Sequence, residues 1–559
     1  MNRRHRLLPC ALAAMLVACG GGDRASEKAA DPPPASSTPP PSSSPPPTNP
    51  APTNPATPTD VVTYKNDNAR TGQNLTESVL TLANVNQTTF GLLRLLSVDG
   101  KVDAQPLYLS KLTVGTATHN VVFVATEHDS VYALDSDSGS KLWQVSLLGT
   151  GETPSDNHSC GQVTPEIGIT ATPVIDRGAG PNGVIYVVGM SKDSSSAYHQ
   201  RLHALDVTTG AELFGGPVEV TATYPTAGGG TTTFSPGQYE ERAALLLSGG
   251  TVYTSWTSHC DSQPYSGWII AFDQATLSRT RVLNVAPNSH DTGPAIWMSG
   301  GGPAADAAGN VYLLTANGAF ETTLDGNGFP NGQDYGNSFL KLAAGGANLS
   351  VADYFTMKNE VAESLADQDL GSGGGMLLPD LTDSTGTVRH LMVGAGKDGN
   401  IYVVDRDSMG KFSPSANNIW QEIDNAVPQG VWATPAYFNG FVYYGDYASA
   451  LKAFSVTSAK LSTTPTSQTP IAFAAHGAAP SVSANGTSNG IVWVHQDTGA
   501  AVLHAFDASN LAHELYDSTQ AANGRDSFGT SNKFITPMVA DGKVFVGTNS
   551  GVGVFGLIQ

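Results

Sequence analysis

The sequence predicts an all-β protein, an eight-bladed β-propeller of four-stranded antiparallel blades, and two observations carry this prediction. First, a phrase recurs eight times: an apolar strand, a short polar loop, and a second strand that ends in Ala-Leu-Asp or Ala-Phe-Asp in its clearest copies. Second, the strands are short runs of Val, Ile, Tyr and Phe between Gly, Asp and Asn turns, with almost no helical periodicity. Radial repetition of such units protects the edges of each sheet.

The repeated units follow one another along most of the chain. Clear copies are "NVVFVATEHDSVYALD" (Asn120 to Asp135) and "GVIYVVGMSKDSSSAYHQRLHALD" (Gly183 to Asp206), and each copy follows a further strand rich in small residues. The last copy, "KVFVGTNSGVGVF", and the small-residue strand before it supply three strands near Gln559. We therefore expect the strand Thr88 to Val98 to complete the final blade and close the ring. A seven-bladed ring with one irregular excursion is the alternative.

The turn after the first copy carries an aromatic residue, in "YALDSDSGSKLW" ending at Trp143. An aromatic side chain that follows a Gly turn can pack over the neighbouring blade. The segment also resembles the tryptophan-docking repeat of the quinoprotein dehydrogenase superfamily. "HALDVTTGAELF" repeats it with Phe214 in place of the Trp. This motif supports the propeller fold strongly and any chemistry weakly.

Composition excludes one class of function. The 559 residues carry a formal charge of −20, with 28 Lys and Arg against 48 Asp and Glu. Electrostatic binding to nucleic acid or to anionic lipid is therefore not expected.

The N-terminal residues 1–18 are predicted to be a signal peptide, with Arg residues before a short apolar stretch that is too short to span a membrane. "LVAC", ending at Cys19, resembles a bacterial lipobox, which implies lipidation of Cys19 and an anchor in the membrane. Gly20, rather than Asp, then favours the outer membrane. An ordinary secretory signal is the alternative. Residues 19–60 are expected to be a disordered Pro/Ser/Thr-rich linker, and residues 61–559 the propeller.

Functional residues are expected at one open end of the ring, which we call its mouth. In a four-stranded blade, the loop between the second and third strands emerges on the same face as the loop that leads into the first strand, and these loops are unusually polar here. Cys160 and Cys260 lie in two such loops of adjacent blades. An exported chain meets an oxidising compartment, so a disulfide between them is expected, with two free thiols as the alternative.

At this mouth the chain resembles the pyrroloquinoline quinone (PQQ) dehydrogenases. The long loop of the fourth blade begins with "TANGAF" and ends with "GQDYGNSF", which matches Asn317 to the family's calcium-ligating Asn and Asp334 to its catalytic base. "GAGKDGNIYVVDRDSMG" matches Lys397 to the basic residue that binds the quinone carbonyls. "PEIG" matches Glu166 to a calcium-ligating Glu, and Trp297 lies near the tryptophan on which the quinone stacks.

These residue types suit the implied chemistry, although the match is partial. Calcium prefers hard oxygen ligands, a carboxylate can take a hydroxyl proton, and an indole supplies a stacking surface. However, Ala316 replaces the family's Gly, Tyr335 follows the Asp, and the family's adjacent cysteine pair is absent. The chain also has no haem-attachment motif, so electrons would leave to another carrier.

Two functions from different classes follow. The first is a calcium- and PQQ-dependent dehydrogenase that oxidises an alcohol or a sugar. The second is a noncatalytic propeller scaffold that binds proteins or polysaccharide at the cell envelope, which the lipobox, the linker and the missing cysteine pair favour. A lectin-like or polymer-degrading propeller that uses Glu240 and Glu241 is weaker, because adjacent strand residues point to opposite faces.

Overall fold

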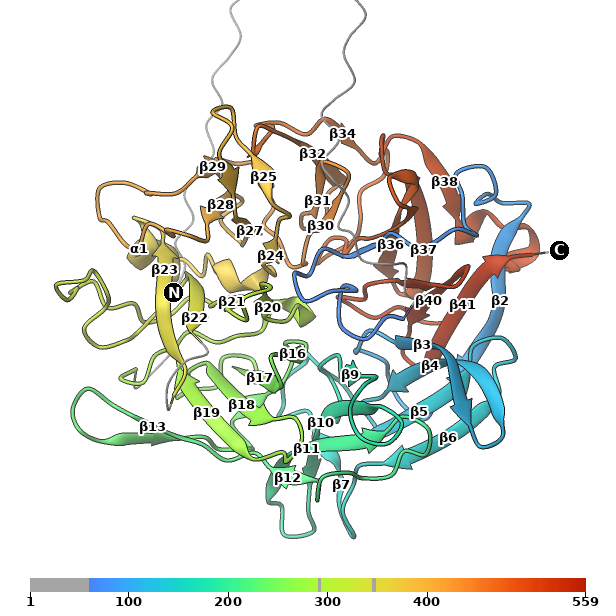
Figure 1. The fold of residues 1–559 in the computed structure, drawn as a ribbon, viewed down its shortest axis with the longest axis horizontal. Coiled ribbons are helices and arrows are strands. Elements are labelled where there is room, and N and C mark those ends of the chain that lie inside the picture. The colour runs from blue at the N-terminus through green and yellow to red at the C-terminus, as the bar shows by residue number, and fades with distance from the viewer. Residues whose placement is uncertain (1–59, 290–292, 344–347, 559) are drawn as a thin grey trace, which may run out of the picture. The chain divides into compact units, whose positions relative to one another are not determined.

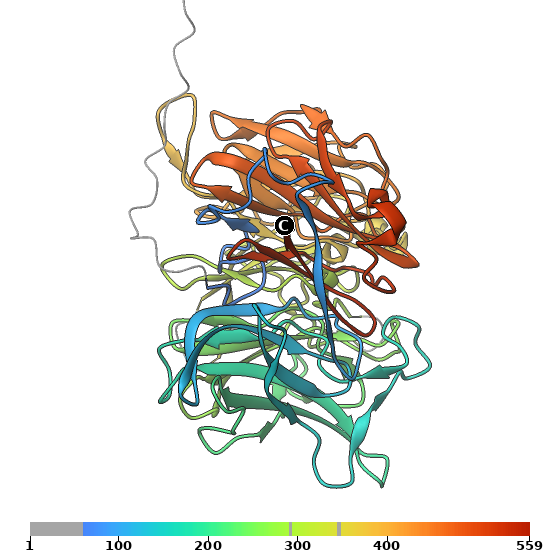
Figure 2. The ribbon, with the colours of Figure 1, turned by 90° about the vertical axis from the view of Figure 1, so that its right-hand side faces the viewer.

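The computed structural model describes residues 60–289, 293–343 and 348–558. The predicted signal peptide, Cys19, which is predicted to be lipidated, and all of the predicted linker except residue 60 lie outside the described residues. The described chain folds into eight antiparallel sheets that follow one another in a single circuit, as the colours of Figure 1 show and Figure 2 shows from the side. The predicted all-β, eight-bladed propeller is confirmed, and the seven-bladed alternative is excluded.

The first four blades run in sequence order from the inner to the outer strand. They are β3 (Leu107–Val114), β4 (Ala117–Ala125), β5 (Ser130–Asp135) and β6 (Lys141–Ser146); β9 (Val174–Asp176), β10 (Val184–Lys192), β11 (Tyr198–Asp206) and β12 (Val218–Glu219); β16 (Leu246–Ser248), β17 (Thr251–Ser258), β18 (Trp268–Asp273) and β19 (Arg279–Asn284); and β20 (Ala304–Ala305), β21 (Val311–Leu314), β22 (Ser338–Ala343) and β23 (Ser350–Thr356).

Blades 5 to 8 have the same order, except that the outer strand of blade 8 lies upstream of its other strands in the sequence. They are β24 (Met376–Leu377), β27 (Leu391–Ala395), β28 (Ile401–Asp405) and β29 (Gln421–Ile423); β30 (Ala436–Phe438), β31 (Phe441–Gly445) and β32 (Leu451–Thr457) with β33 (Lys460–Leu461) and β34 (Ser467–Gln468); β35 (Ser481–Asn485), β36 (Ser488–Thr498), β37 (Ala500–Asp507) and β38 (Glu514–Asp517); and β39 (Met538–Ala540), β40 (Lys543–Gly547), β41 (Gly551–Leu557) and β2 (Phe90–Ser97).

Short elements decorate the blades. The remaining strands are β1 (Gln73–Asn74), β7 (Thr153–Asp156), β8 (Glu166–Ile167), β13 (Thr223–Pro225), β14 (Thr231–Thr233), β15 (Tyr239–Glu240), β25 (Leu381–Thr382) and β26 (Val388–Arg389). The helices are α1 (Glu360–Leu365) and the 3₁₀ turns η1 (Met298–Gly300), η2 (Leu370–Ser372), η3 (Ser518–Gln520) and η4 (Ala522–Gly524). Among the described residues, none of these helices has the length and apolar character needed to cross a bilayer.

The ring closes as the sequence predicts. Strand β2, far upstream of the other strands of its blade, pairs antiparallel with β41 from Phe90 opposite Leu557 to Ser97 opposite Gly551. Phe90 is fully buried, and its ring lies 5.3 Å from Trp493, 4.9 Å from Tyr516 and 6.3 Å from Phe555. The closing strand thus joins the core between blades 7 and 8.

Blade-to-blade packing explains the docking turn. The indole N–H of Trp143 donates to the carbonyl of Val207 in the next blade at 3.0 Å. Gly210 has φ +71°, and a Cβ there would lie 2.8 Å from the Trp143 ring. The aromatic residue of one turn therefore rests on the glycine of the next, which is the contact between neighbouring blades that the sequence predicted.

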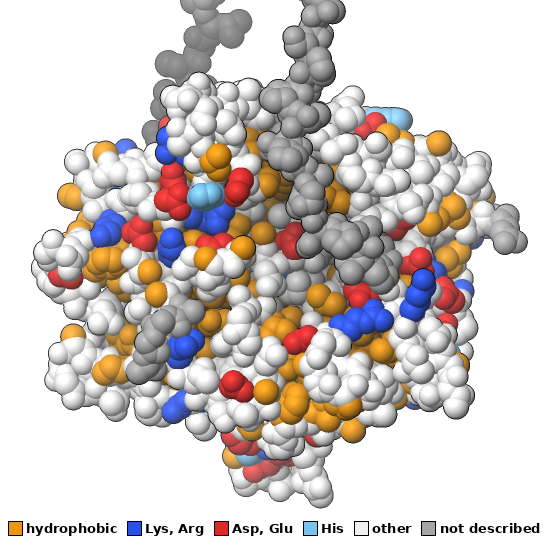
Figure 3. All heavy atoms as spheres, in the orientation of Figure 1, with side chains coloured by type: hydrophobic (Ala, Val, Ile, Leu, Met, Phe, Trp, Pro, Cys, Tyr) orange, Lys and Arg blue, Asp and Glu red, His pale blue; other side chains and the backbone are white. Residues whose placement is uncertain are grey.

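Because each blade packs against two neighbours, both faces of its middle strands are buried; all residues of β5, the third strand of blade 1, are buried, for example. The face of the propeller in Figure 3 shows acidic and basic side chains interspersed among neutral ones. It displays no large basic field, in agreement with the acidic composition.

Candidate functional site

A cavity of about 150 Å³ lies among loops of the ring. Its walls come from the loops that lead into blades 2 to 6 and from the second-to-third-strand loops of blades 3, 4 and 5. These are the two classes of loop that were expected to share the polar mouth. We call this space the mouth cavity.

Three of the predicted site residues, Trp297, Asn317 and Lys397, line the mouth cavity and converge on Asp369. The indole N–H of Trp297 donates to Oδ2 of Asp369 at 3.1 Å, and the backbone N–H of Asn317 donates to Oδ1 at 3.2 Å. Nζ of Lys397 lies 3.8 Å from Oδ2 of Asp369 and 2.9 Å from Oδ1 of Asp367. Asp367 and Asp369 lie in the loop that leads into blade 5, one of the class expected at the mouth, but the sequence analysis singled out neither of them.

Asp369 is the buried centre of this group. Only 3% of its surface is exposed, and burial raises the pKa of its carboxyl from 3.8 to about 6. The nearby Lys397 charge and the hydrogen bonds from Trp297 and Asn317 favour the carboxylate and oppose this rise. Near neutral pH the group is therefore ionised, with a pKa that suits proton acceptance better than that of an exposed aspartate.

Close backbone packing holds these loops together. A Cβ on Gly396 would lie 2.4 Å from the carbonyl oxygen of Asp369, so only glycine lets the Lys397 loop approach Asp369 this closely. Gly318 has φ +140°, and a Cβ there would lie 2.6 Å from the backbone nitrogen of Pro294. Backbone contact between the two loops of blade 5, and between the two loops of blade 4, thus sets the positions of the side chains.

Asp334 lies apart from this group. It lines a separate, open pocket of about 350 Å³ together with Asn288 and Glu321. The backbone N–H and the side-chain amide of Asn288 both donate to Oδ1 of Asp334 at 3.2 Å. The long loop folds back here, since the N–H of Tyr335 donates to the carbonyl of Val285 at 2.8 Å. The structure therefore does not bring Asp334 into the mouth cavity with Asn317.

Glu166 also lies outside the lining of the mouth cavity. It opens the short strand β8, and its Oε1 lies 2.9 Å from Nδ1 of His128. Its side chain is 31% exposed. The two residues matched to calcium ligands, Glu166 and Asn317, are thus not neighbours in the lining of one cavity.

Cys160 and Cys260 are joined by a disulfide, with Cα atoms 5.7 Å apart. The bond connects the loop that leads into blade 2 with the second-to-third-strand loop of blade 3. Gln162 and Asp261, which flank the two cysteines, line the mouth cavity. The disulfide therefore ties together two loops of the cavity wall.

Glu240 and Glu241 do not form an exposed acid pair. Their exposed fractions are 1% and 6%, and Oε1 of Glu240 lies 3.4 Å from the guanidinium of Arg242. Among the described residues, neither carboxylate oxygen of Glu241 has a hydrogen-bond partner. A pair of catalytic carboxylates that acts on a polymer needs access to it, and this pair has none.

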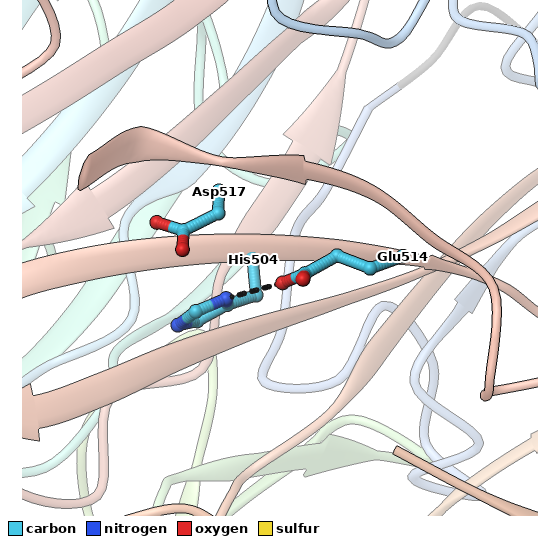
Figure 4. A group of neighbouring side chains, drawn as sticks. All are labelled: His504, Glu514 and Asp517. Carbon is cyan, nitrogen blue, oxygen red and sulfur yellow. Dashed lines mark hydrogen bonds and ion pairs between the residues drawn. The ribbon is translucent and has the colours of Figure 1, made fainter. Parts of the chain in front are cut away.

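A second cluster has the residue types of a metal site. His504, Glu514 and Asp517 lie close together on β37 and β38 of blade 7 (Figure 4). Nδ1 of His504 lies 2.8 Å from Glu514, and Nε2 lies 2.9 Å from Gln496, so both ring nitrogens have protein partners. The same His-to-Glu contact recurs in blade 2 between His203 and Glu212. Its recurrence marks it as a structural pair of the repeat.

No protein-family model matches the chain, and no curated protein matches it. Solved structures do match. The quinohemoprotein alcohol dehydrogenase of Comamonas testosteroni aligns with a TM-score of 0.59 at 15% identity, over 89% of this chain and 80% of that one. That of Pseudomonas putida HK5 aligns with a TM-score of 0.56 at 13% identity, over 89% and 80%.

The fold of this chain is similar to that of the quinoprotein alcohol dehydrogenases. A europium-containing methanol dehydrogenase aligns as well, with a TM-score of 0.54 at 15% identity, over 89% of this chain and 91% of that one. At these identities the likeness shows the propeller fold alone and no particular activity.

Proposed function

We propose that this quinoprotein-like propeller is a dehydrogenase that oxidises an alcohol or a sugar with PQQ and a divalent cation held in the mouth cavity. The observation that carries the proposal is the convergence of Trp297, Asn317 and Lys397 on Asp369. These side chains come from separate loops, and three of them were selected from sequence motifs alone. Their meeting in one cavity is not expected of unrelated turn residues.

The residues of the cavity fit the proposed cofactor by their chemistry. The indole of Trp297 offers a flat apolar face to a planar ring system, and the ammonium of Lys397 offers donors to carbonyl oxygens. The side-chain oxygens of Asn317 and Asp367 are the hard ligands that calcium prefers. When bound, the quinone would accept hydride from the carbinol carbon. Glu166, which contacts His128, has no part in this ligand set.

Within this proposal, Asp369 takes the role that the resemblance assigns to Asp334. Its carboxylate is buried in the cavity wall, where it can accept the hydroxyl proton of a substrate at Oδ1 or Oδ2. Lys397 stabilises the ionised form before the transfer. Closely packed loops around the carboxylate limit the access of bulk water.

Binding tests the proposal. Calorimetry and quinone absorbance with calcium and PQQ should show saturable binding to the chain without its signal and linker. Trp297→Ala should weaken it about tenfold through the lost stacking surface. Asp334→Asn is the matched control and should bind like the wild type, because Asp334 lines another pocket. Asp369→Asn should bind the quinone yet lose about 100-fold or more in dye-linked oxidation.

Two results would contradict the dehydrogenase proposal. Absence of saturable quinone binding would favour the noncatalytic scaffold at the cell envelope instead. Equal losses of affinity in Trp297→Ala and Asp334→Asn would show that the mouth cavity is not the binding site.

We propose further that the propeller is exported and anchored to the outer membrane by lipid on Cys19, where it meets its substrate or an envelope protein partner. The lipobox-like "LVAC" supports this proposal. Metabolic labelling with a fatty acid analogue should mark the wild-type chain and not Cys19→Ser. Equal labelling of both chains would rule out this anchor.

A further inference from the structure

Arg242 is a buried cation in the wall of the mouth cavity. It lies between β15 and β16, in the loop that leads into blade 3, and only 4% of its surface is exposed. It shares the cavity lining with Trp297, Lys397 and Gln162. The proposed function uses Trp297 and Lys397 and leaves Arg242 without a role.

The guanidinium of Arg242 has more N–H donors than the neighbouring residues have acceptor atoms for it. It carries five N–H groups, yet the described residues give it a single hydrogen bond, a long one of 3.4 Å to Oε1 of Glu240. Asp103 lies 3.9 Å away, beyond hydrogen-bond reach, and already pairs with Lys101 at 2.9 Å and accepts from Asn532 at 2.8 Å. Nε of Arg242 is buried with no partner among the described residues.

Arg242 has aromatic neighbours. The guanidinium carbon lies 4.7 Å from the ring centre of Phe534, and that ring meets the indole of Trp297 edge-on at 6.2 Å. Arg242 is therefore held beside the wall of the cavity that the indole forms. The planar guanidinium of an arginine presents its donors as a fork, which matches the two oxygens of a carboxylate.

We infer that Arg242 marks a carboxylate-binding subsite in the mouth cavity. A carboxylate seated there would give the guanidinium the acceptors that it lacks among the described residues and replace the weak contact with Glu240. Two ligands could supply this group: an acidic substrate such as a sugar acid, or a carboxylate of the quinone. In either form the inference deepens the proposed function, on which its role in catalysis rests, but carboxylate binding itself needs no cofactor.

The test is calorimetry on the chain without added metal or quinone for the first source, and with PQQ for the second. In the first arm, glucuronate should bind and glucose should bind at least tenfold more weakly. In the second arm, PQQ should bind more tightly than its trimethyl ester. Arg242→Gln should reduce the affinity for the responsible acid by about 10- to 100-fold and remove its advantage over the neutral analogue.

Two further variants separate the recognition of a carboxylate from general effects of charge or folding. Arg242→Lys keeps the charge but loses the fork, and it should restore only part of the affinity. Arg389→Gln is the matched control, since Arg389 stacks on Trp420 and does not line the cavity. If the Arg242 variants do not fold, the Nε–H resonance of Arg242 in the wild-type chain should still shift on addition of the acid and stay unchanged with the neutral analogue.

Each outcome is informative. Glucuronate binding that depends on Arg242, without quinone binding, would support the subsite while the dehydrogenase proposal fails. Quinone binding that is equal in wild type and Arg242→Gln, with no preference for either acid, would overturn the subsite and leave the dehydrogenase proposal intact. A site filled only by water would show no preference between acid and neutral analogue, which would also overturn the inference.

Discussion

Closure of the ring by β2 predicts a stability effect that can be worked from the structure. Phe90→Ala removes a fully buried ring that contacts Trp493, Tyr516 and Phe555. Such truncations cost about 3–5 kcal/mol in the free energy of unfolding. With an unfolding entropy of about 2.1 cal/mol/K per residue and roughly 500 residues, the entropy is about 1 kcal/mol/K, so the melting temperature should fall by about 3–5 °C.

Leu95→Ala on the same strand is the matched control. Leu95 is 52% exposed, so its truncation should change the free energy of unfolding by less than about 0.5 kcal/mol. Melting followed by circular dichroism compares the two variants. Hydrogen exchange should also show lost protection in β41, the partner of β2, in Phe90→Ala alone. Equal shifts in the two variants, or no shift in Phe90→Ala, would refute closure through the buried face of β2.

Two more predictions concern the loops. Replacing both Cys160 and Cys260 by Ala removes the covalent link between two loops of the cavity wall. Amide hydrogen exchange should therefore become faster at residues 157–162 and 258–265 and stay unchanged in the blade strands. Equal exchange rates at these loops in the wild type and the double variant would contradict a role of the disulfide in holding the wall. Burial, more than the nearby charges of Asp398 and other acids, raises the pKa of Glu363 in α1 from 4.5 to about 8. Between these values the unfolded chain ionises this carboxyl while the folded chain keeps its proton, so the free energy of unfolding should fall by up to about 1.4 kcal/mol per unit as pH rises from about 5 to about 8. Urea unfolding across this range should show a smaller fall in Glu363→Gln, and identical slopes would disprove the assignment.

Much of the architecture was predictable because it repeats. The strand alternation and turn chemistry recur eight times, so an ambiguity in one unit is resolved by the others. The docking turn is one example, since Trp143 and Gly210 belong to the same turn motif in two successive units and meet in the structure. Ring closure was predictable for the same reason, because the last unit has three strands and one upstream strand was left over.

The sequence by itself determined the fold, the polar mouth and the residues that directly follow strands. Asn317 and Lys397 come within three residues of the ends of β21 and β27, where strand geometry still fixes their direction. Only the tertiary structure decided the centre of the site. Asp334 lies near the end of a long loop whose path is set by contacts with Val285 and Asn288, which lie in the connection between blades 3 and 4. Asp369 reaches the cavity because glycine lets two loops touch, and no spacing along the chain reveals such contacts.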